Sequence, residues 1–212
     1  SQKNPDSKSL APYAKLLANS KSLFTYILVL LEGVFIIGSF SYIGAFISKT
    51  YHFNYFYIGL IMTGFGLASV LGGRMSGKLV HRMGPRKLLS LGLICATLAD
   101  LTLAYFGNLL GAMIGAVALL GFGFIFTHST LLTRATEFAQ KARGAAMSLV
   151  AFCFMGGGGL GTAIGGKIIG TYGLEKLFWV YGMALLVTWL LSYALIRDHV
   201  VEENELLEQV VS

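Results

Sequence analysis

Charged side chains are scarce in this sequence. Asp, Glu, Lys and Arg make up 12% of the 212 residues, and 55% are hydrophobic. A soluble domain carries roughly a quarter charged residues, so too few are present here to cover a water-facing surface. Only 2 Cys and 3 Pro are present, which excludes a disulfide scaffold and argues against a disordered or collagen-like chain despite 27 Gly. The composition predicts a helical protein that crosses a membrane several times.

Six apolar stretches are long enough to cross a bilayer. A span needs about 20 residues to cross about 30 Å of hydrocarbon at about 1.5 Å per residue. The predicted fold class is therefore an all-α membrane protein with six transmembrane helices, near residues 23–47, 55–79, 87–106, 109–132, 144–169 and 177–196. This bundle, residues 23–196, lies between a polar N-terminal segment, residues 1–22, and an acidic tail, residues 197–212, which is either a short amphipathic helix or a solvated end.

The distribution of Lys and Arg predicts the orientation of the bundle. Six spans bring both termini to one side, and cytoplasmic loops of membrane proteins carry an excess of positive residues. The terminal segments and the links after the second and fourth spans carry 13 of the 16 Lys and Arg residues, against three on the other side. Both termini are therefore predicted to be cytoplasmic, in a plasma or inner membrane. The net charge of +6 is interpreted as an orientation signal and a lipid contact, with no nucleic-acid partner.

A basic turn joins the second and third predicted spans. It reads Gly77-Lys78-Leu79-Val80-His81-Arg82-Met83-Gly84-Pro85-Arg86-Lys87. Gly77 allows helices to approach closely, and Gly84 with Pro85 suits a tight turn. Taken alone, this is a positively charged cytoplasmic loop of a kind that any membrane protein can have.

The spacing of this turn resembles the signature loop of the major facilitator superfamily, which has Gly, an acid, Arg, a spacer, Gly, a spacer and two basic residues. The residues that fit are Gly77, Arg82, Gly84, Arg86 and Lys87. His81 stands where the family usually has Asp, so this chain departs from the charge pairing by which that acid helps to latch one conformation. The resemblance implies that the loop acts as a conformational latch.

The fifth predicted span contains a run of small residues, Gly157-Gly158-Gly159-Leu160-Gly161-Thr162-Ala163-Ile164-Gly165-Gly166. This run resembles the antiporter signature of the same family, Gly-x-x-x-Gly-Pro-x-x-Gly-Gly, with Thr162 in place of Pro. The matching positions are Gly157, Gly161, Gly165 and Gly166. Small residues at this spacing also allow helix backbones to touch, so helix packing is the simpler interpretation.

The resemblance covers the chain after its N-terminal segment and implies one six-helix half of a proton-coupled, efflux-type transporter. A complete transporter of this family has two such halves. Residues 1–22 then look like the linker between the halves, and the chain is expected to be the C-terminal half; a six-helix protein that pairs with itself is the alternative. The expected partners are the lipid bilayer, the other half, a small-molecule substrate such as a drug or sugar, and protons.

Glu32 lies near the middle of the first span, about 14 Å from its cytoplasmic end. Placing an ionisable residue at this depth costs several kcal/mol, so such a residue is expected to have a functional or structural role. The side chains within about 80° of it on a helical wheel are Phe35, Ser39, Tyr42 and Phe46. The resemblance implies that the first and fourth helices of a half line the central cavity. Glu32, Ser39 and Tyr42 are therefore candidate substrate or proton ligands; the alternative is a protonated Glu32 bonded within a helix interface.

His128 and Phe124 share one face of the fourth span, which the resemblance makes the second cavity helix. His128 lies about one turn from the cytoplasmic end. It is a candidate proton carrier near neutral pH, or an interfacial side chain bonded to a carbonyl. Asp100, in the third span, is interpreted as structural because the resemblance makes that helix peripheral.

No enzyme, cofactor or metal site is predicted. The four histidines have no zinc-ligand spacing, and the chain has no Gly-x-Ser-x-Gly nucleophile motif. Gly72–Leu79 nearly matches a phosphate-binding loop but lacks its final Ser or Thr. Cys95 and Cys153 are interpreted as small apolar side chains within helices. The predicted function is export by a secondary transporter with alternating access. Proton-driven uptake, a six-helix channel and an intramembrane enzyme are the alternatives.

Overall fold

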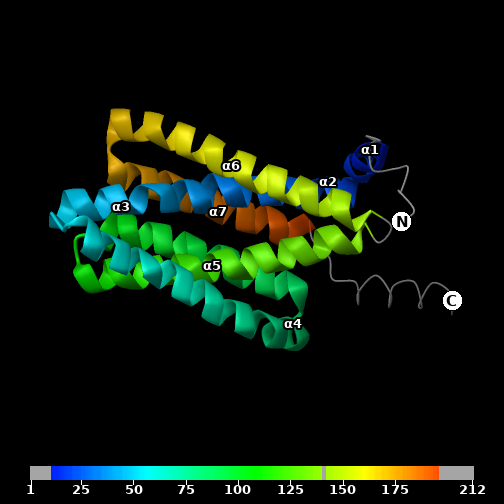
Figure 1. The fold of residues 1–212 in the computed structure, drawn as a ribbon, viewed down its shortest axis with the longest axis horizontal. Helices are drawn as coiled ribbons and strands as arrows, with labels where there is room; N and C mark the ends of the chain where they lie inside the picture. Colours follow the sequence, from blue (N-terminus) through cyan, green and yellow to red (C-terminus); the bar gives the residue numbers. More distant parts are fainter. Residues whose placement is uncertain (1–10, 140–141, 196–212) are drawn as a thin grey trace, which may run out of the picture.

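The computed structural model describes residues 11–139 and 142–195, and the secondary structure in these ranges is entirely helical (Figure 1). The elements are α1 (Ala11–Ala18), α2 (Ser20–Glu32), the π-helical segment η2 (Gly33–Ile37), α3 (Gly38–Tyr51), α4 (Tyr55–Phe106), α5 (Leu110–Glu137), α6 (Arg143–Tyr172) and α7 (Leu174–Leu195). The acidic tail, residues 197–212, and the first ten residues lie outside the described ranges. The all-helical expectation is confirmed for the described part of the chain.

Five helices in the described ranges are long and apolar enough to cross a membrane, instead of the six predicted. The difference lies in α4, whose 52 residues contain both the second and the third predicted spans. The backbone leaves helical geometry within α4 at Gly84, with φ 80° and ψ 161°. Glycine takes positive φ without strain, and the Pro85 ring disfavours helical geometry at the preceding residue. The predicted tight turn is therefore present, and it divides α4 into two arms, residues 55–83 and 85–106.

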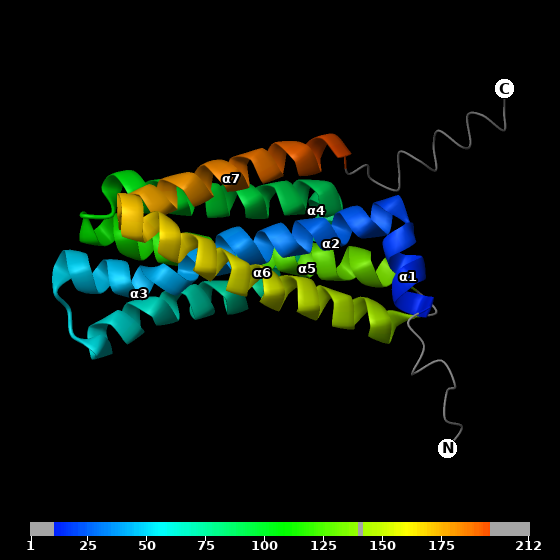
Figure 2. The same cartoon turned by 90° about the horizontal axis from the view of Figure 1, so that it is seen from above.

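The two arms of α4 run in opposite directions (Figure 2). A straight helix of this length would extend about 78 Å, yet both of its ends lie close to Tyr51. The Tyr51 hydroxyl donates a 2.8 Å hydrogen bond to the carbonyl of Gly107, just after α4. The Tyr51 ring stacks on Phe53, which in turn contacts Tyr57 in the first turn of α4. Apart from this fusion, the largest boundary difference is at the end of α5, which extends to Glu137 instead of Leu132.

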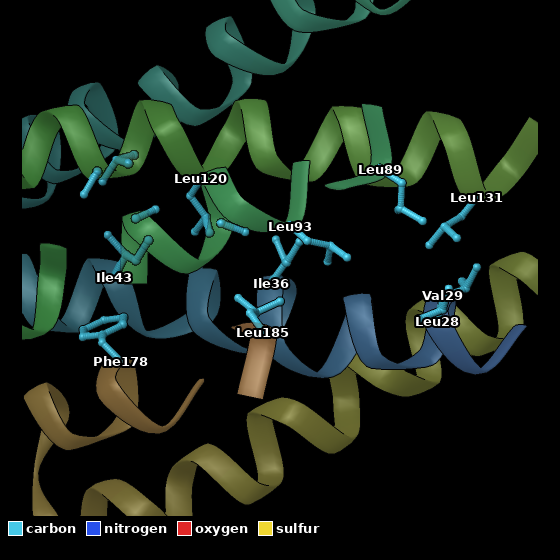
Figure 3. Packing of buried hydrophobic residues seen from close by; sticks show 14 of the residues in the cluster. Leu28, Val29, Ile36, Ile43, Leu89, Leu93, Leu120, Leu131, Phe178 and Leu185 are labelled. Atoms are coloured by element: carbon cyan, nitrogen blue, oxygen red, sulfur yellow. The ribbon is translucent and has the colours of Figure 1, made fainter. Parts of the chain in front are cut away.

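The continuous helix formed by α2, η2 and α3 lies at the centre of the fold. The side chain of Asn19 caps its start by accepting hydrogen bonds from the backbone N–H groups of Lys21 and Ser22. The helix ends at His52, whose left-handed backbone (φ 54°) is a common helix terminus. Its buried side chains meet those of α4, α5 and α7 in one apolar core (Figure 3). The labelled core residues in Figure 3 are Leu28, Val29, Ile36, Ile43, Leu89, Leu93, Leu120, Leu131, Phe178 and Leu185.

Helix α6 packs against the central helix with the two backbones in contact. A Cβ atom added to Gly161 would stand 2.0 Å from the carbonyl oxygen of Val34, and one added to Gly157 would stand 2.3 Å from that of Leu30. On the other side of the contact, a Cβ on Gly33 would lie 2.3 Å from the carbonyl oxygen of Phe154. Lipid is as apolar as the helix surfaces, so the attraction here comes from close van der Waals contact and not from the exclusion of water.

The links rich in Lys and Arg lie at one end of the bundle. The break within α4, helix α1, the C-terminal end of α5, the N-terminal end of α6 and the C-terminal end of α7 all lie toward the right-hand end of the bundle in Figure 1. The links from α3 to α4 and from α6 to α7 lie at the opposite end. In the described part of the chain, the loops rich in Lys and Arg therefore lie opposite the loops that have few such residues.

Candidate proton and substrate site

Glu32 and His128 form a pair inside the bundle. Glu32 is the last residue of α2, its side chain points toward α5, and it is 1% exposed. Its Oε2 atom lies 3.1 Å from Nδ1 of His128. The second oxygen, Oε1, has no hydrogen-bond partner within the described residues. A carboxyl and an imidazole at this distance can hold one proton as an ion pair or as two neutral groups, and can gain or lose a further proton.

Aromatic rings surround the imidazole of His128. The ring of Phe124, one turn earlier on α5, stacks on it at 5.3 Å between centroids with an interplanar angle of 27°. The ring of Phe154 on α6 lies 4.7 Å from it and 5.7 Å from Phe124. The His128 side chain is still 23% exposed, whereas that of Glu32 is fully covered. His128 is therefore the more accessible member of the pair.

The π-helical segment η2 begins directly after Glu32. The N–H of Gly38 reaches back five residues to the carbonyl of Gly33, one residue further than in an α-helix. Within this wide turn, the carbonyl oxygen of Val34 faces the backbone of Gly161 in α6. Single π-turns are rare and occur often at functional sites. Because the helical wheel assumes about 3.6 residues per turn, it misplaces side chains that follow η2 relative to Glu32.

Ser39 and Tyr42 contact other helices and not the Glu32–His128 pair. Ser39 is 0% exposed and donates a 2.5 Å hydrogen bond to Oδ1 of Asp100 in the second arm of α4. The half-buried Tyr42 donates a 2.5 Å hydrogen bond to the carbonyl of Thr162 in α6. Of the five predicted ligands, the structure brings together Glu32, Phe124 and His128.

The predicted antiporter-like glycines lie on the face of α6 that meets the central helix. Gly157 and Gly161 make the backbone contacts described above. The ring of Tyr42 occupies the space beside Gly165, where an added Cβ would stand 2.6 Å away, and the Tyr42 hydroxyl lies 3.2 Å from the same position on Gly166. Thr162, which replaces the proline of the signature, donates a hydrogen bond to the carbonyl of Gly158 one turn earlier.

One cation of the predicted latch loop is tied to another helix. The guanidinium of Arg86 donates to the carbonyl of Tyr193 and lies 4.1 Å over its ring. This carbonyl is in the last turn of α7, where oxygens lack helical partners and a positive charge is favourable. The other predicted latch residues lie along α4, with Gly84 at the break. Gly77, His81, Arg82 and Lys87 are all exposed.

Sequence reasoning missed two features of this region. Phe154, which contacts His128, belongs to an apolar helix, and nothing in its neighbourhood sets it apart. The contact between Ser39 and Asp100 was also missed, although an acid within an apolar span requires a polar partner and could have signalled one. In the ranges that the structure describes, no group of three or more His, Cys, Asp or Glu residues could hold a metal ion.

Long apolar helices around a buried acid–histidine pair define a multi-pass membrane protein with a polar site inside its helical bundle. The model of the Major Facilitator Superfamily matches residues 23–210. The match covers most of the chain, which therefore belongs to the Major Facilitator Superfamily of transporters.

Two curated relatives match most of the chain. It is 26% identical over 181 residues to a human protein named Solute carrier family 67 member A1, which covers 84% of this chain and 42% of the relative. It is 26% identical over 176 residues to a Probable sugar efflux transporter of Helicobacter pylori strain J99, which covers 82% of this chain and 44% of the relative. The chain thus spans less than half the length of either relative.

Proposed function

We propose that this chain forms one half of a secondary transporter that exports a small molecule, such as a sugar or a drug, in exchange for protons. The observation that carries the proposal is the Glu32–His128 pair, buried midway along the central helix. Secondary transporters bind substrate and coupling ion near the bilayer midplane and expose them to each side in turn as two bundles rock. Membership of a transporter family supports the general function, and the pair supports the coupling to protons.

The environment of the pair favours proton binding over a purely structural role. An ionised Glu32 without a cationic partner would be costly at 1% exposure, so its charge depends on the state of His128. Histidine titrates near neutral pH, and its ring is partly exposed here. Gain and loss of one proton therefore change the net charge of the pair in an apolar setting. Such a change can bias one arrangement of two bundles over another, which is what coupling requires.

We propose that α4 crosses the membrane twice, which gives six crossings in all. The two antiparallel arms on either side of Gly84 support this count. The basic turn between the arms then lies in the cytoplasm of a plasma or inner membrane, together with both termini. The tie between Arg86 and Tyr193 would act within the cytoplasmic latch by joining α4 to the end of α7.

The other half of the carrier would cover the least buried spans. Only 22% of the most apolar stretch of α6 is buried, and large apolar side chains of this helix are exposed. The first arm of α4 also exposes a row of apolar residues. A second six-helix bundle, either another part of a longer chain or a second copy, would pack on these faces and close a site over His128.

The Helicobacter pylori relative is named a Probable sugar efflux transporter, which supports export and a sugar as substrate. The aromatic rings of Phe124 and Phe154 beside His128 suit the apolar face of a sugar or of a flat drug molecule. Uptake driven by protons is the alternative direction, because the same pair would serve either.

Transport by the full-length natural protein in liposomes tests this proposal. Radiolabelled hexoses and pentoses and a fluorescent cationic drug would be offered with and without an imposed pH gradient, with empty liposomes as the control. We expect flux of at least one of these compounds that saturates with concentration, increases with the gradient and falls when a protonophore removes it. Flux of any compound that never saturates would indicate a channel, and saturable flux that ignores the gradient would contradict proton coupling.

A further inference from the structure

A second acid, Asp100, is buried within the same bundle and has no role in the proposed function. It lies in the second arm of α4 and is 0% exposed. Its Oδ1 accepts the 2.5 Å hydrogen bond from Ser39. Its Oδ2 is buried and has no hydrogen-bond partner in the described part of the chain. Among the same residues no Lys, Arg or His forms an ion pair with it, which sets it apart from Glu32.

Apart from Ser39, the groups packed around Asp100 are apolar or already bonded elsewhere. From α3, Ser39 is the polar neighbour. From α7, Tyr181 is the titratable group that faces Asp100, but its hydroxyl donates to the carbonyl of Gly161. The ring of Phe35 packs edge-on against Tyr181 at 5.5 Å. Gly182 of α7 approaches the Cβ atom of Asp100 so closely that an added methyl would stand 3.3 Å from it.

This arrangement suits a neutral carboxyl group and not a carboxylate. A buried charge is stable in proteins when it is paired and fully hydrogen-bonded. Here a single hydroxyl bonds one carboxyl oxygen, and the other oxygen has no hydrogen-bond partner in the described part of the chain. A metal cation would require about six oxygen ligands, whereas the site shows two carboxyl oxygens and one hydroxyl. A proton is the one ligand that neutralises the group without further ligands or space. We propose that Asp100 is a second proton-binding site, separate from the Glu32–His128 pair and loaded with a proton in this conformation.

The two acid sites are linked through η2. Glu32 immediately precedes this π-helical segment, and Ser39, the partner of Asp100, follows it after one residue. If η2 changed from π-helical to α-helical geometry, its turn would contain one residue fewer. Ser39 would then rotate by about 100° relative to Glu32. Such a rotation takes the hydroxyl away from Asp100 and changes its affinity for the proton. The link between the two acid sites deepens the proposed function and rests on it. The presence of a proton on Asp100 does not rest on the proposed function.

Infrared spectroscopy of the full-length natural protein in lipid at neutral pH tests the proton directly, because a protonated carboxyl and a carboxylate absorb at different frequencies. We expect a protonated-carboxyl band that is absent in Asp100→Asn and retained when Glu32→Gln removes the other acid. An unchanged band in Asp100→Asn, with loss of carboxylate absorption instead, would overturn the proposal. Loss of the band on adding sodium at fixed pH would also overturn it, by assigning the site to a metal cation.

The Ser39→Ala variant provides a second measurement if Asp100→Asn does not fold. Removing the hydroxyl frees the carboxyl from its hydrogen bond, so the band should move to higher frequency while its intensity stays constant. The matched control Ser41→Ala removes a hydroxyl that donates to the carbonyl of Ile37 and accepts from the hydroxyl of Thr162 in α6. Neither partner is Asp100, so this variant should leave the band in place. No shift in Ser39→Ala would contradict the assignment. None of these spectra needs substrate or a gradient, so the proton can be found at Asp100 even if the proposed transport fails.

Discussion

One buried acid belongs to the central helix and another packs against it, and their partners differ. Glu32 faces His128, which can carry a charge and is 23% exposed, within a cluster of aromatic rings. Asp100 faces Ser39, which carries no charge and is completely buried. The two carboxyl groups are similarly buried, so the side chain bonded to each carboxyl group determines whether it can exchange its proton. The comparison suggests a readily exchanging proton at Glu32 and one at Asp100 that exchanges only when helices move.

The largest expected effect comes from removing the contact that holds η2 between the two acids. In Gly161→Val the new side chain would stand against the backbone carbonyl of Val34, which has no flexible end to move aside. We expect a loss of about 3 kcal/mol of stability or more, because overpacking against backbone forces the helices apart. The measurement is the yield of monodisperse protein after extraction from the membrane. Gly159→Val, where no atom lies within 4 Å, is the control; equal yields would show that this contact does not organise the region.

The next effect tests whether Glu32 and His128 act as one unit. Glu32→Gln and His128→Gln should each reduce gradient-driven transport by about 100-fold, because either change leaves a pair that cannot carry the proton. The double variant should be no worse than either single one, since groups that act together are not additive. The exposed residues Glu175 and His52 supply the controls Glu175→Gln and His52→Asn; asparagine tolerates the left-handed backbone at His52. Losses that multiply in the double variant would contradict the shared site.

A smaller effect is expected at the second acid. Ser39→Ala removes the hydrogen-bond donor to buried Asp100 and should lower the free energy of unfolding by about 1–3 kcal/mol. Ser41→Ala, on an exposed part of the same helix, should change it by less than about 0.5 kcal/mol. Thermal unfolding of both variants in detergent gives the comparison. A Ser39→Ala protein as stable as Ser41→Ala would mean that the hydroxyl contributes nothing to holding the acid.

The sequence predicted the helices well because a bilayer imposes a minimum length on apolar segments. It also predicted the break at Gly84, since a glycine before proline marks a turn wherever it occurs. Glu32 and His128 were identified one at a time, as ionisable groups inside apolar spans. Their pairing was not predictable in the same way, because 96 positions separate them and spacing within one helix does not reveal which other helix lies beside it.

The predicted polar face of Glu32, Ser39 and Tyr42 could not be placed correctly from residue spacing within one helix. A regular α-helix would align Ser39 and Tyr42 with Glu32 on one face, but η2 inserts a wide turn between them. Nothing in the residues Gly33–Ile37 indicates a π-turn. The π-turn coincides with the close approach of α6, which the glycines of both helices permit and which sequence spacing within one helix does not reveal. As a result Ser39 meets Asp100 and Tyr42 meets Thr162.

The central claim is that the proton moved by this carrier binds at the Glu32–His128 pair, and substrate exchange in liposomes tests it most directly. In Glu32→Gln, gradient-driven transport should fall by about 100-fold, while exchange of labelled for unlabelled substrate at equal pH on both sides should continue near the wild-type rate. That result would separate the proton from the binding of substrate and from the motion of the bundles. Gradient-driven transport at the wild-type rate in Glu32→Gln would contradict the account.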